Sequence, residues 1–192
     1  MRSSTFRIPL SLIAMALVCS FSRGAAGADP PTSQPAQSGR GAQTWRFPEE
    51  HFEIQAPGYL EKHSSKEEHM VLLLRSNVSR GPGTLHDVFN VVVTPLSNPP
   101  SLDVLVNAAQ KKAAELHPEA KFDPVQRLVL DGAPAAVYAF TCKVGAQQAK
   151  EFRVLSVSHD RFYLIGFLCE ASAGDQSELL LKRMLETFHW VD

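Results

Sequence analysis

The last third of the chain has the clearest pattern of apolar and polar positions. Three segments rich in β-branched and aromatic residues, 137–143, 151–158 and 161–169, are separated by short sequences typical of turns, a pattern that predicts a β-meander. The pair His159 and Asp160 is short enough for a tight hairpin between the second and third segments. Both faces of this meander are apolar, so we expect other elements to cover both.

Hairpin turns at 145–148 and 159–160 set the register of the meander, with Phe140 near Arg153 and Leu155 near Leu164. Because alternate residues of a strand point to the same side, one face is predicted to carry Tyr138, Phe140, Leu155, Val157, Phe162 and Leu164. The opposite face is predicted to carry Val137, Phe152, Val154, Tyr163, Ile165 and Phe167.

Two segments have the apolar spacing of three to four residues that is typical of amphipathic helices. The first follows Ser101, a candidate N-cap, and stops before Pro118. The second closes the chain and can be capped by Asp175 or Ser177; its apolar side comprises Leu180, Leu181, Met184, Leu185 and Phe188.

Further strands are expected at 45–47, 52–56, 70–74, 88–93 and 121–130. The fold class that follows is α+β. We expect an antiparallel sheet of about six to seven strands with helices on both faces, because neither face of the meander can remain in water.

The first 28 residues have the layout of a secretory signal peptide. Arg2 and Arg7 precede an apolar stretch at 8–21, and the small residues at 26–28 form a cleavage site. The apolar stretch is shorter than the roughly 20 residues needed to span a bilayer. We therefore expect cleavage and no integral membrane segment in the mature protein. A retained anchor and lipidation at Cys19 are the alternatives.

Residues 29–43, rich in proline, serine and glutamine, form a predicted disordered linker. Residues 44–192 are long enough for a single domain with its own core. Removal of the signal peptide deletes three arginines and no acidic residue, which takes the formal net charge from −1 to about −4. An exported, mildly acidic protein is expected in the periplasm or outside the cell, without affinity for nucleic acid.

The two cysteines of the predicted domain, Cys142 and Cys169, would suit a disulfide in an oxidising compartment. In the predicted meander, however, a third strand separates them, which places their backbones roughly 9 to 10 Å apart. A disulfide requires less than about 7 Å between Cα atoms, and the register puts the two on opposite faces. We therefore expect two buried thiols and no disulfide.

Imidazole and carboxylate groups gather at His63, Glu67, Glu68 and His69. This combination can hold zinc or manganese, so a divalent-metal site formed by His63, Glu67 and His69 is one hypothesis. The spacing matches no established metal motif, and a solvated charged loop is the alternative.

No sequence motif of a catalytic site is present. The chain has no G-x-S-x-G, H-E-x-x-H, C-x-x-C or phosphate-binding glycine pattern. Ser156 and Ser158 precede His159 and Asp160, but neighbouring residues of a hairpin point in different directions and should not form a triad. We expect no catalytic residues, and an unrecognised hydrolase remains the second alternative.

Gly166 and Arg153 are the candidate ligand-binding residues. A glycine inside an apolar strand permits the close approach of a helix or a ligand. Arg153 is predicted to lie beside Gly166 with Glu151 nearby. The arginine can either form a cross-strand ion pair at the sheet edge or anchor an anionic ligand.

Several short segments resemble motifs of the PsbP-like superfamily. The strand FEI at 52–54 leads into PGY at 57–59, which is similar to the opening of these proteins. The segment LDGAPA at 130–135 resembles their glycine-centred hairpin, and LETF at 185–188 resembles their closing helix. The order of the elements is similar over nearly all of the mature chain.

The resemblance implies an antiparallel sheet between helices and a binding or accessory role without catalysis or a cofactor. The superfamily includes the extrinsic subunit P of photosystem II, a Ran-binding nuclear import factor and exported bacterial proteins. We therefore expect an exported, non-enzymatic protein that binds a protein partner or a small ligand. Its candidate binding surfaces are the charged segment 60–68, the glycine-rich loop 79–84 and the uncovered edge of the sheet.

Overall fold

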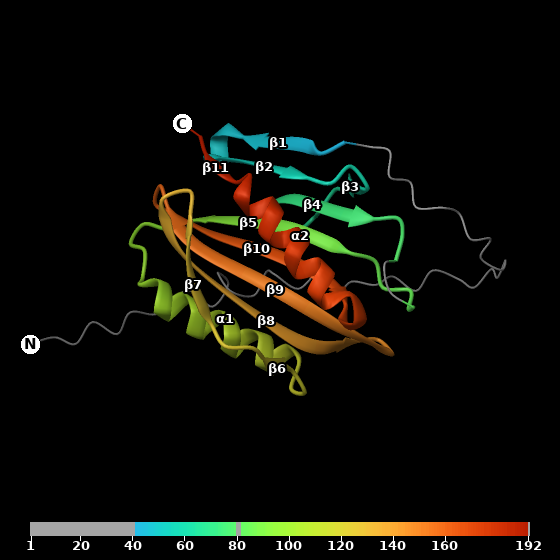
Figure 1. Cartoon of the computed structure of the whole chain (residues 1–192). Helices are drawn as coiled ribbons and strands as arrows, with labels where there is room; N and C mark the ends of the chain where they lie inside the picture. The colour runs from blue at the N-terminus through green and yellow to red at the C-terminus, as the bar shows by residue number, and fades with distance from the viewer. Residues whose placement is uncertain (1–40, 80–81, 192) are drawn as a thin grey trace, which may run out of the picture.

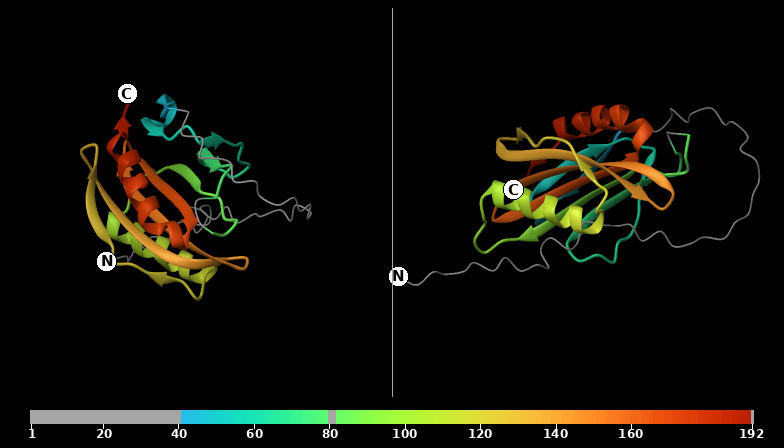
Figure 2. Two further views of the ribbon diagram at one scale, coloured as in Figure 1. Left: turned by 45° about the vertical axis from the view of Figure 1, so that its right-hand side comes forward. Right: turned by 90° about the horizontal axis from the view of Figure 1, so that it is seen from below.

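A large antiparallel sheet lies between two helices in this protein. The computed structural model describes residues 41–79 and 82–191 (Figure 1). Helix α1 (Leu102–Leu116) covers one face of the sheet and helix α2 (Gly174–Glu186) covers the other, as the two views of Figure 2 show. The predicted signal peptide and most of the predicted linker lie outside the described residues.

The strands occupy most of the remaining chain. In order, they are β1 (Gln43–Phe47), β2 (Phe52–Ala56), β3 (Leu60–Lys62), β4 (Met70–Ser76), β5 (Val88–Pro95), β6 (Lys121–Phe122), β7 (Gln126–Leu130), β8 (Ala133–Val144), β9 (Gln147–Ser158), β10 (Arg161–Glu170) and β11 (His189–Trp190). Single turns of 3-10 helix lie at Pro48–Glu50 and Ala171–Ala173.

The sheets contain more strands than the sequence predicts. The central sheet has eight antiparallel strands in the order β3-β4-β5-β10-β9-β8-β6, with β7 also paired to β8. A second sheet of three strands, β1-β2-β11, was not expected. The predicted strand at 121–130 is two short strands, because Pro124 has no backbone N–H to donate to a sheet ladder. The predicted α+β class with antiparallel strands is confirmed.

The expected register is right in one hairpin and wrong in the other. Leu155 lies opposite Leu164 as predicted, and His159 and Asp160 form the two-residue turn, with φ angles of 50° and 54°. Phe140 lies opposite Glu151 instead of Arg153, because the β8–β9 turn has two residues and not four. A shift of two residues leaves every side chain on its predicted face.

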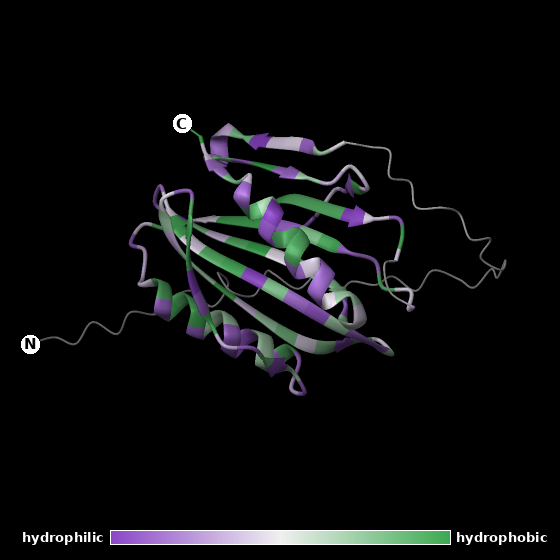
Figure 3. Cartoon of the chain, in the orientation of Figure 1, coloured by the Kyte–Doolittle hydropathy of each residue, from purple (hydrophilic) through white to green (hydrophobic). Residues whose placement is uncertain are grey.

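Both apolar faces of the meander are buried in separate cores. On one face, Leu105, Val106, Ala109 and Ala113 of α1 pack on the predicted set that includes Tyr138, Phe140 and Leu155. On the other, Leu181 and Met184 of α2 pack on the set that includes Phe152, Val154 and Ile165. Figure 3 shows the long apolar stretches of the central strands that these helices cover.

The two helices begin differently. The Ser101 hydroxyl accepts a hydrogen bond from the backbone N–H of Val104 at the start of α1, so the predicted N-cap is confirmed. The predicted caps of α2 are wrong. That helix begins at Gly174 after Ala173, without a hydrogen bond from a capping side chain, and Ser177 is fully buried within it.

The three-stranded sheet shares the core on the α2 side of the central sheet. Phe52, Ile54 and Ala56 of β2 are buried there. The Tyr163 hydroxyl on β10 donates a hydrogen bond to the Glu50 carbonyl at 2.9 Å. Burial raises the pKa of Tyr163 to about 12, so the phenol stays neutral and can keep donating at physiological pH.

The structure places Cys142 on β8 and Cys169 on β10, with β9 between them. Their side chains belong to the cores on opposite faces of the sheet.

We predict that the mature protein, residues 29–192, carries two thiols. Alkylation after denaturation without a reductant should add two labels in a mass spectrum. A protein that takes up no label would contain a disulfide and contradict this strand order.

Candidate functional site

The structure does not assemble the predicted metal site. The backbone of His63 pairs with the carbonyl of Leu73, while His69 lies in a turn with φ 64° and its Nε2 atom is 3.5 Å from Glu68. Within residues 41–79 and 82–191, no group of three or more His, Cys, Asp or Glu side chains could hold a metal ion. His63, Glu67 and His69 are therefore not brought together.

The serines of the β9–β10 hairpin do not form a triad in the described part of the chain. Ser156 is buried and donates a hydrogen bond to the Pro134 carbonyl. Ser158 does contact His159, with Oγ 2.9 Å from Nδ1, although neighbouring residues were expected to diverge. The His159 ring stacks on His51 with centroids 5.0 Å apart, and no described carboxylate forms an ion pair with it. An orienting acid is thus missing from this pair.

The two candidate ligand-binding residues lie in a buried polar row under α1. Gly166 on β10 is paired with Arg153 on β9 and with Asn90 on β5, and Arg153 is also paired with Tyr138 on β8. All three polar side chains are buried, and Arg153 is only 2% exposed. This row crosses the middle of the sheet, whereas the sequence placed Arg153 at an edge.

Arg153 is held by a residue of its own strand. Its Nε atom lies 2.6 Å from Oε1 of Glu151, and its guanidinium carbon lies 5.2 Å from the centre of the Phe140 ring. Burial alone would lower the pKa of Arg153, but the charge and hydrogen bond of Glu151 together with those of Tyr138 outweigh burial, and the pKa is raised. Burial raises the pKa of Tyr138 as well. The arginine is therefore charged and already neutralised within the core, and in the described ranges no ion pair joins it to another strand.

Gly166 makes room for a side chain and not for a helix or a ligand. A Cβ atom at this position would lie 2.8 Å from Oδ1 and 3.0 Å from Nδ2 of Asn90. Because real Cβ atoms do not approach that closely, any larger residue would displace the asparagine from the row. The buried row is thus a packed polar layer of the core.

A pocket lies on the opposite face, between α2 and strands β7 and β8, and we call it the α2 pocket. Its volume is about 390 Å³. The apolar part of its lining includes Leu128, Leu130, Val137, Phe152, Leu181 and Leu185. The polar part of its lining comprises Asp123, Gln126, Glu178, Lys182 and Glu186.

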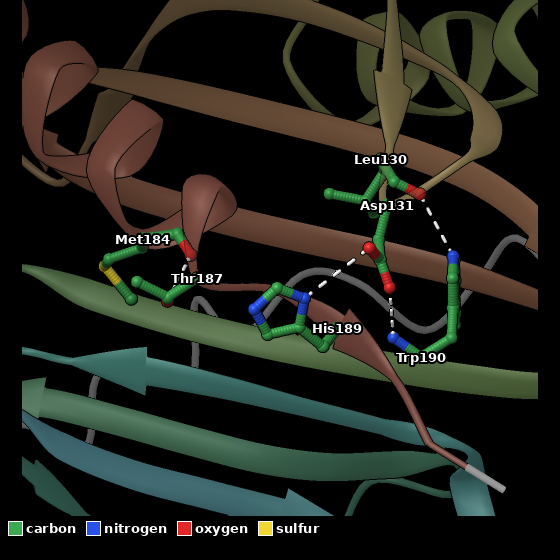
Figure 4. A network of polar contacts seen from close by, with 6 residues as sticks. All are labelled: Leu130, Asp131, Met184, Thr187, His189 and Trp190. Carbon is green, nitrogen blue, oxygen red and sulfur yellow. Dashed lines mark hydrogen bonds and ion pairs between the residues drawn. The ribbon is translucent and has the colours of Figure 1, made fainter.

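One end of the α2 pocket is fixed by contacts between the β7–β8 turn and the segment after α2 (Figure 4). The Asp131 carboxylate accepts a hydrogen bond from the Trp190 backbone N–H at 2.8 Å and lies 3.5 Å from Nδ1 of His189. The Trp190 indole N–H donates to the Leu130 carbonyl at 3.0 Å. These contacts tie the end of β7 to the segment after α2, next to Leu130 of the pocket lining.

Lys150 lies beside two residues that line the α2 pocket, Asp123 and Phe152. Its Nζ atom lies 3.3 Å from the Asp123 carboxylate and 5.2 Å from the centre of the Phe152 ring. Its aliphatic part lies against the first residue of α2, since a Cβ on Gly174 would be 2.9 Å from Cδ of Lys150. The lysine therefore contacts the β6–β7 connection, the sheet and the helix at once.

The α2 pocket was not predicted from the sequence, because its lining comes from elements far apart in the chain. Pro124, which divides the predicted strand at 121–130, was the one visible signal. The predicted binding surfaces stay predictions. Segment 60–68 begins with β3, and the Gly83 N–H donates to the buried Glu170 at 2.7 Å.

The contact between Gly166 and Asn90 gives a direct test of the buried row. We predict that Gly166→Ala lowers the free energy of unfolding by about 1–3 kcal/mol, because the new methyl group overpacks the row. In an Asn90→Ala background the same substitution should cost much less, since the clashing side chain is gone. Urea denaturation of the wild type, the two single variants and the double variant measures the loss of unfolding free energy in each background. An equal cost in the two backgrounds would show that Asn90 is not the residue that requires glycine.

Comparison with known proteins gives matches in structure only. No protein-family model matches the sequence, and no curated protein matches it. Among solved structures, cyanobacterial PsbP (CyanoP) from Synechocystis sp. PCC 6803 is 11% identical, with a TM-score of 0.63 over 84% of this chain and 99% of that protein.

Two further structures extend the likeness. The Ran-binding protein Mog1p of Saccharomyces cerevisiae is 15% identical, with a TM-score of 0.55 over 79% of this chain and 96% of that protein. LpqN, involved in cell envelope biogenesis of Mycobacterium tuberculosis, is 7% identical, with a TM-score of 0.61 over 81% of this chain and 88% of that protein. At these identities the likeness extends to the fold alone, and this chain has the PsbP-like fold.

Proposed function

We propose that the protein is an exported, non-catalytic binding protein that holds a small, largely apolar ligand in the α2 pocket. The observation that carries the proposal is the pocket itself. Its volume of about 390 Å³ and its aliphatic and aromatic floor match the size and lining of small-molecule sites in general, which are mostly apolar with a few polar groups at fixed positions.

The rest of the described chain supports binding over catalysis. The serine and histidine of the β9–β10 hairpin have no orienting acid, and the buried Arg153 is already neutralised by Glu151. The α2 pocket contains no paired nucleophile and base, which acyl or phosphoryl transfer would need. An apolar ligand requires neither, because removal of its surface from water supplies the affinity.

Export rests on the signal peptide predicted at residues 1–28, which lies outside the described residues. No described helix is both long and apolar enough to cross a membrane. The structural neighbours do not share one role, since Mog1p is a Ran-binding protein and LpqN is involved in cell envelope biogenesis. That diversity suits a fold that serves binding, with the bound species set by local side chains.

Leu185→Trp tests the proposed site. Leu185 is half-buried and lines the pocket, so a larger side chain there fills the cavity without adding charge. We expect wild-type protein to bind the neutral apolar fluorophore N-phenylnaphthylamine saturably, and Leu185→Trp to weaken that binding about tenfold or more. Fluorescence titration of the mature protein measures both.

Leu179→Trp is the matched control. Leu179 is on the same helix but is 59% exposed and does not line the pocket. This variant should bind the fluorophore as the wild type does, and thermal denaturation should show that both variants fold. Absence of saturable binding in the wild type, or equal binding by Leu185→Trp, would refute the proposed site.

A further inference from the structure

The charges around the α2 pocket are unbalanced. Its lining contains three carboxylates, from Asp123, Glu178 and Glu186, and one ammonium group, from Lys182, which gives a net formal charge of −2. The floor between them is apolar. A ligand that fills the pocket therefore places its apolar part on the floor and its polar end among acidic groups.

Two of the three carboxylates already have cationic partners. Glu178 lies 2.8 Å from Nζ of Lys182, and Asp123 lies 3.3 Å from Nζ of Lys150. Glu186 forms no ion pair with any other residue of the described ranges. It is the one acidic group of the lining whose charge remains uncompensated by the protein itself.

Glu186 also occupies an electrostatically unfavourable position in its helix. It is the last residue of α2, at the negative end of the helix dipole. A carboxylate at this end is disfavoured, whereas a cation would be attracted by both the dipole and the side chain. The end of the helix and the Glu186 carboxylate therefore both attract a positive charge, and both repel a negative one, at this side of the pocket.

We infer that the ligand of the α2 pocket is a small amphiphile with a positively charged end, such as an alkyl ammonium compound, whose cation lies beside Glu186. The inference rests on the proposed function, because it concerns the occupant of that same pocket. A neutral amphiphile would gain only the apolar contacts. An anionic one would be repelled by Glu186 and by the end of α2.

The test compares three ligands with the same chain and different head groups. Octyltrimethylammonium, octyl glucoside and octanoate are titrated into the mature protein below their micelle concentrations by calorimetry at low ionic strength. We expect the cation to bind about three- to tenfold more tightly than the neutral compound, and the anion more weakly than both. Added salt should shrink the difference, because the charges are exposed to solvent.

Three variants separate the effect of the Glu186 charge from the effect of the apolar lining of the pocket. Glu186→Gln should remove the preference for the cation over octyl glucoside. Lys182→Gln should strengthen binding of the cation, since it releases the carboxylate of Glu178. Glu115→Gln, on α1 at the opposite face, should change nothing.

The outcomes distinguish the two proposals. If all three ligands bind with equal affinity and Leu185→Trp weakens all of them, the pocket stands and the inference about charge is wrong. A preference for the cation that survives in Glu186→Gln would also contradict the inference. If none of the ligands binds the wild-type protein, the proposed function fails together with the inference.

Discussion

Both faces of strands β8, β9 and β10 are apolar, and the rest of the chain is arranged to remove them from water. Helix α1 covers one face with small residues, Ala109 and Ala113, which let it lie close to the strands. On the other face, α2 shares the covering with the three-stranded sheet. Several of the elements that cover these strands have only a weak preference of their own for helix or strand. They form because they bury this apolar surface.

The unequal covering of the two faces accounts for the position of the α2 pocket. On the α1 side, the buried row formed by Asn90, Arg153 and Tyr138 is closed by packing and by the ion pair with Glu151. On the α2 side, the helix crosses the sheet and leaves space beside β7 and β8. The contact of Asp131 with Trp190 joins the end of β7 to the segment after α2 beside that space. A pocket with such walls is formed before a ligand arrives, which lowers the entropic cost of binding.

Local patterns were sufficient to predict the core of the fold from the sequence. The period of two in the meander assigned each apolar residue to its correct face, and even the error in the β8–β9 turn kept those faces, because it was an even shift. The helix after Ser101 was equally clear, because its apolar spacing and its N-cap agree. These features depend on residues that are close together in the chain.

Features that depend on distant residues could not be predicted. Strand β11 is two residues long and exists because β2 is beside it, and the apolar lining of the α2 pocket comes from four separate elements. Gly166 and Arg153 were correctly identified as unusual positions. Glu151 was also named beside Arg153, although the two pair within one strand and not across strands. The position of Asn90 over the glycine was missed, because β5 and β10 are far apart in the chain.

The central claim is that apolar ligands bind on the α2 side of the sheet. Methyl resonances of the mature protein, followed by NMR during a titration with octyl glucoside, test it most directly. The account predicts that the largest saturable shifts occur at Leu128, Leu181 and Leu185, while Leu105 and Val106 under α1 stay unchanged. Larger shifts on the α1 side, or no saturable shift on either side, would contradict it.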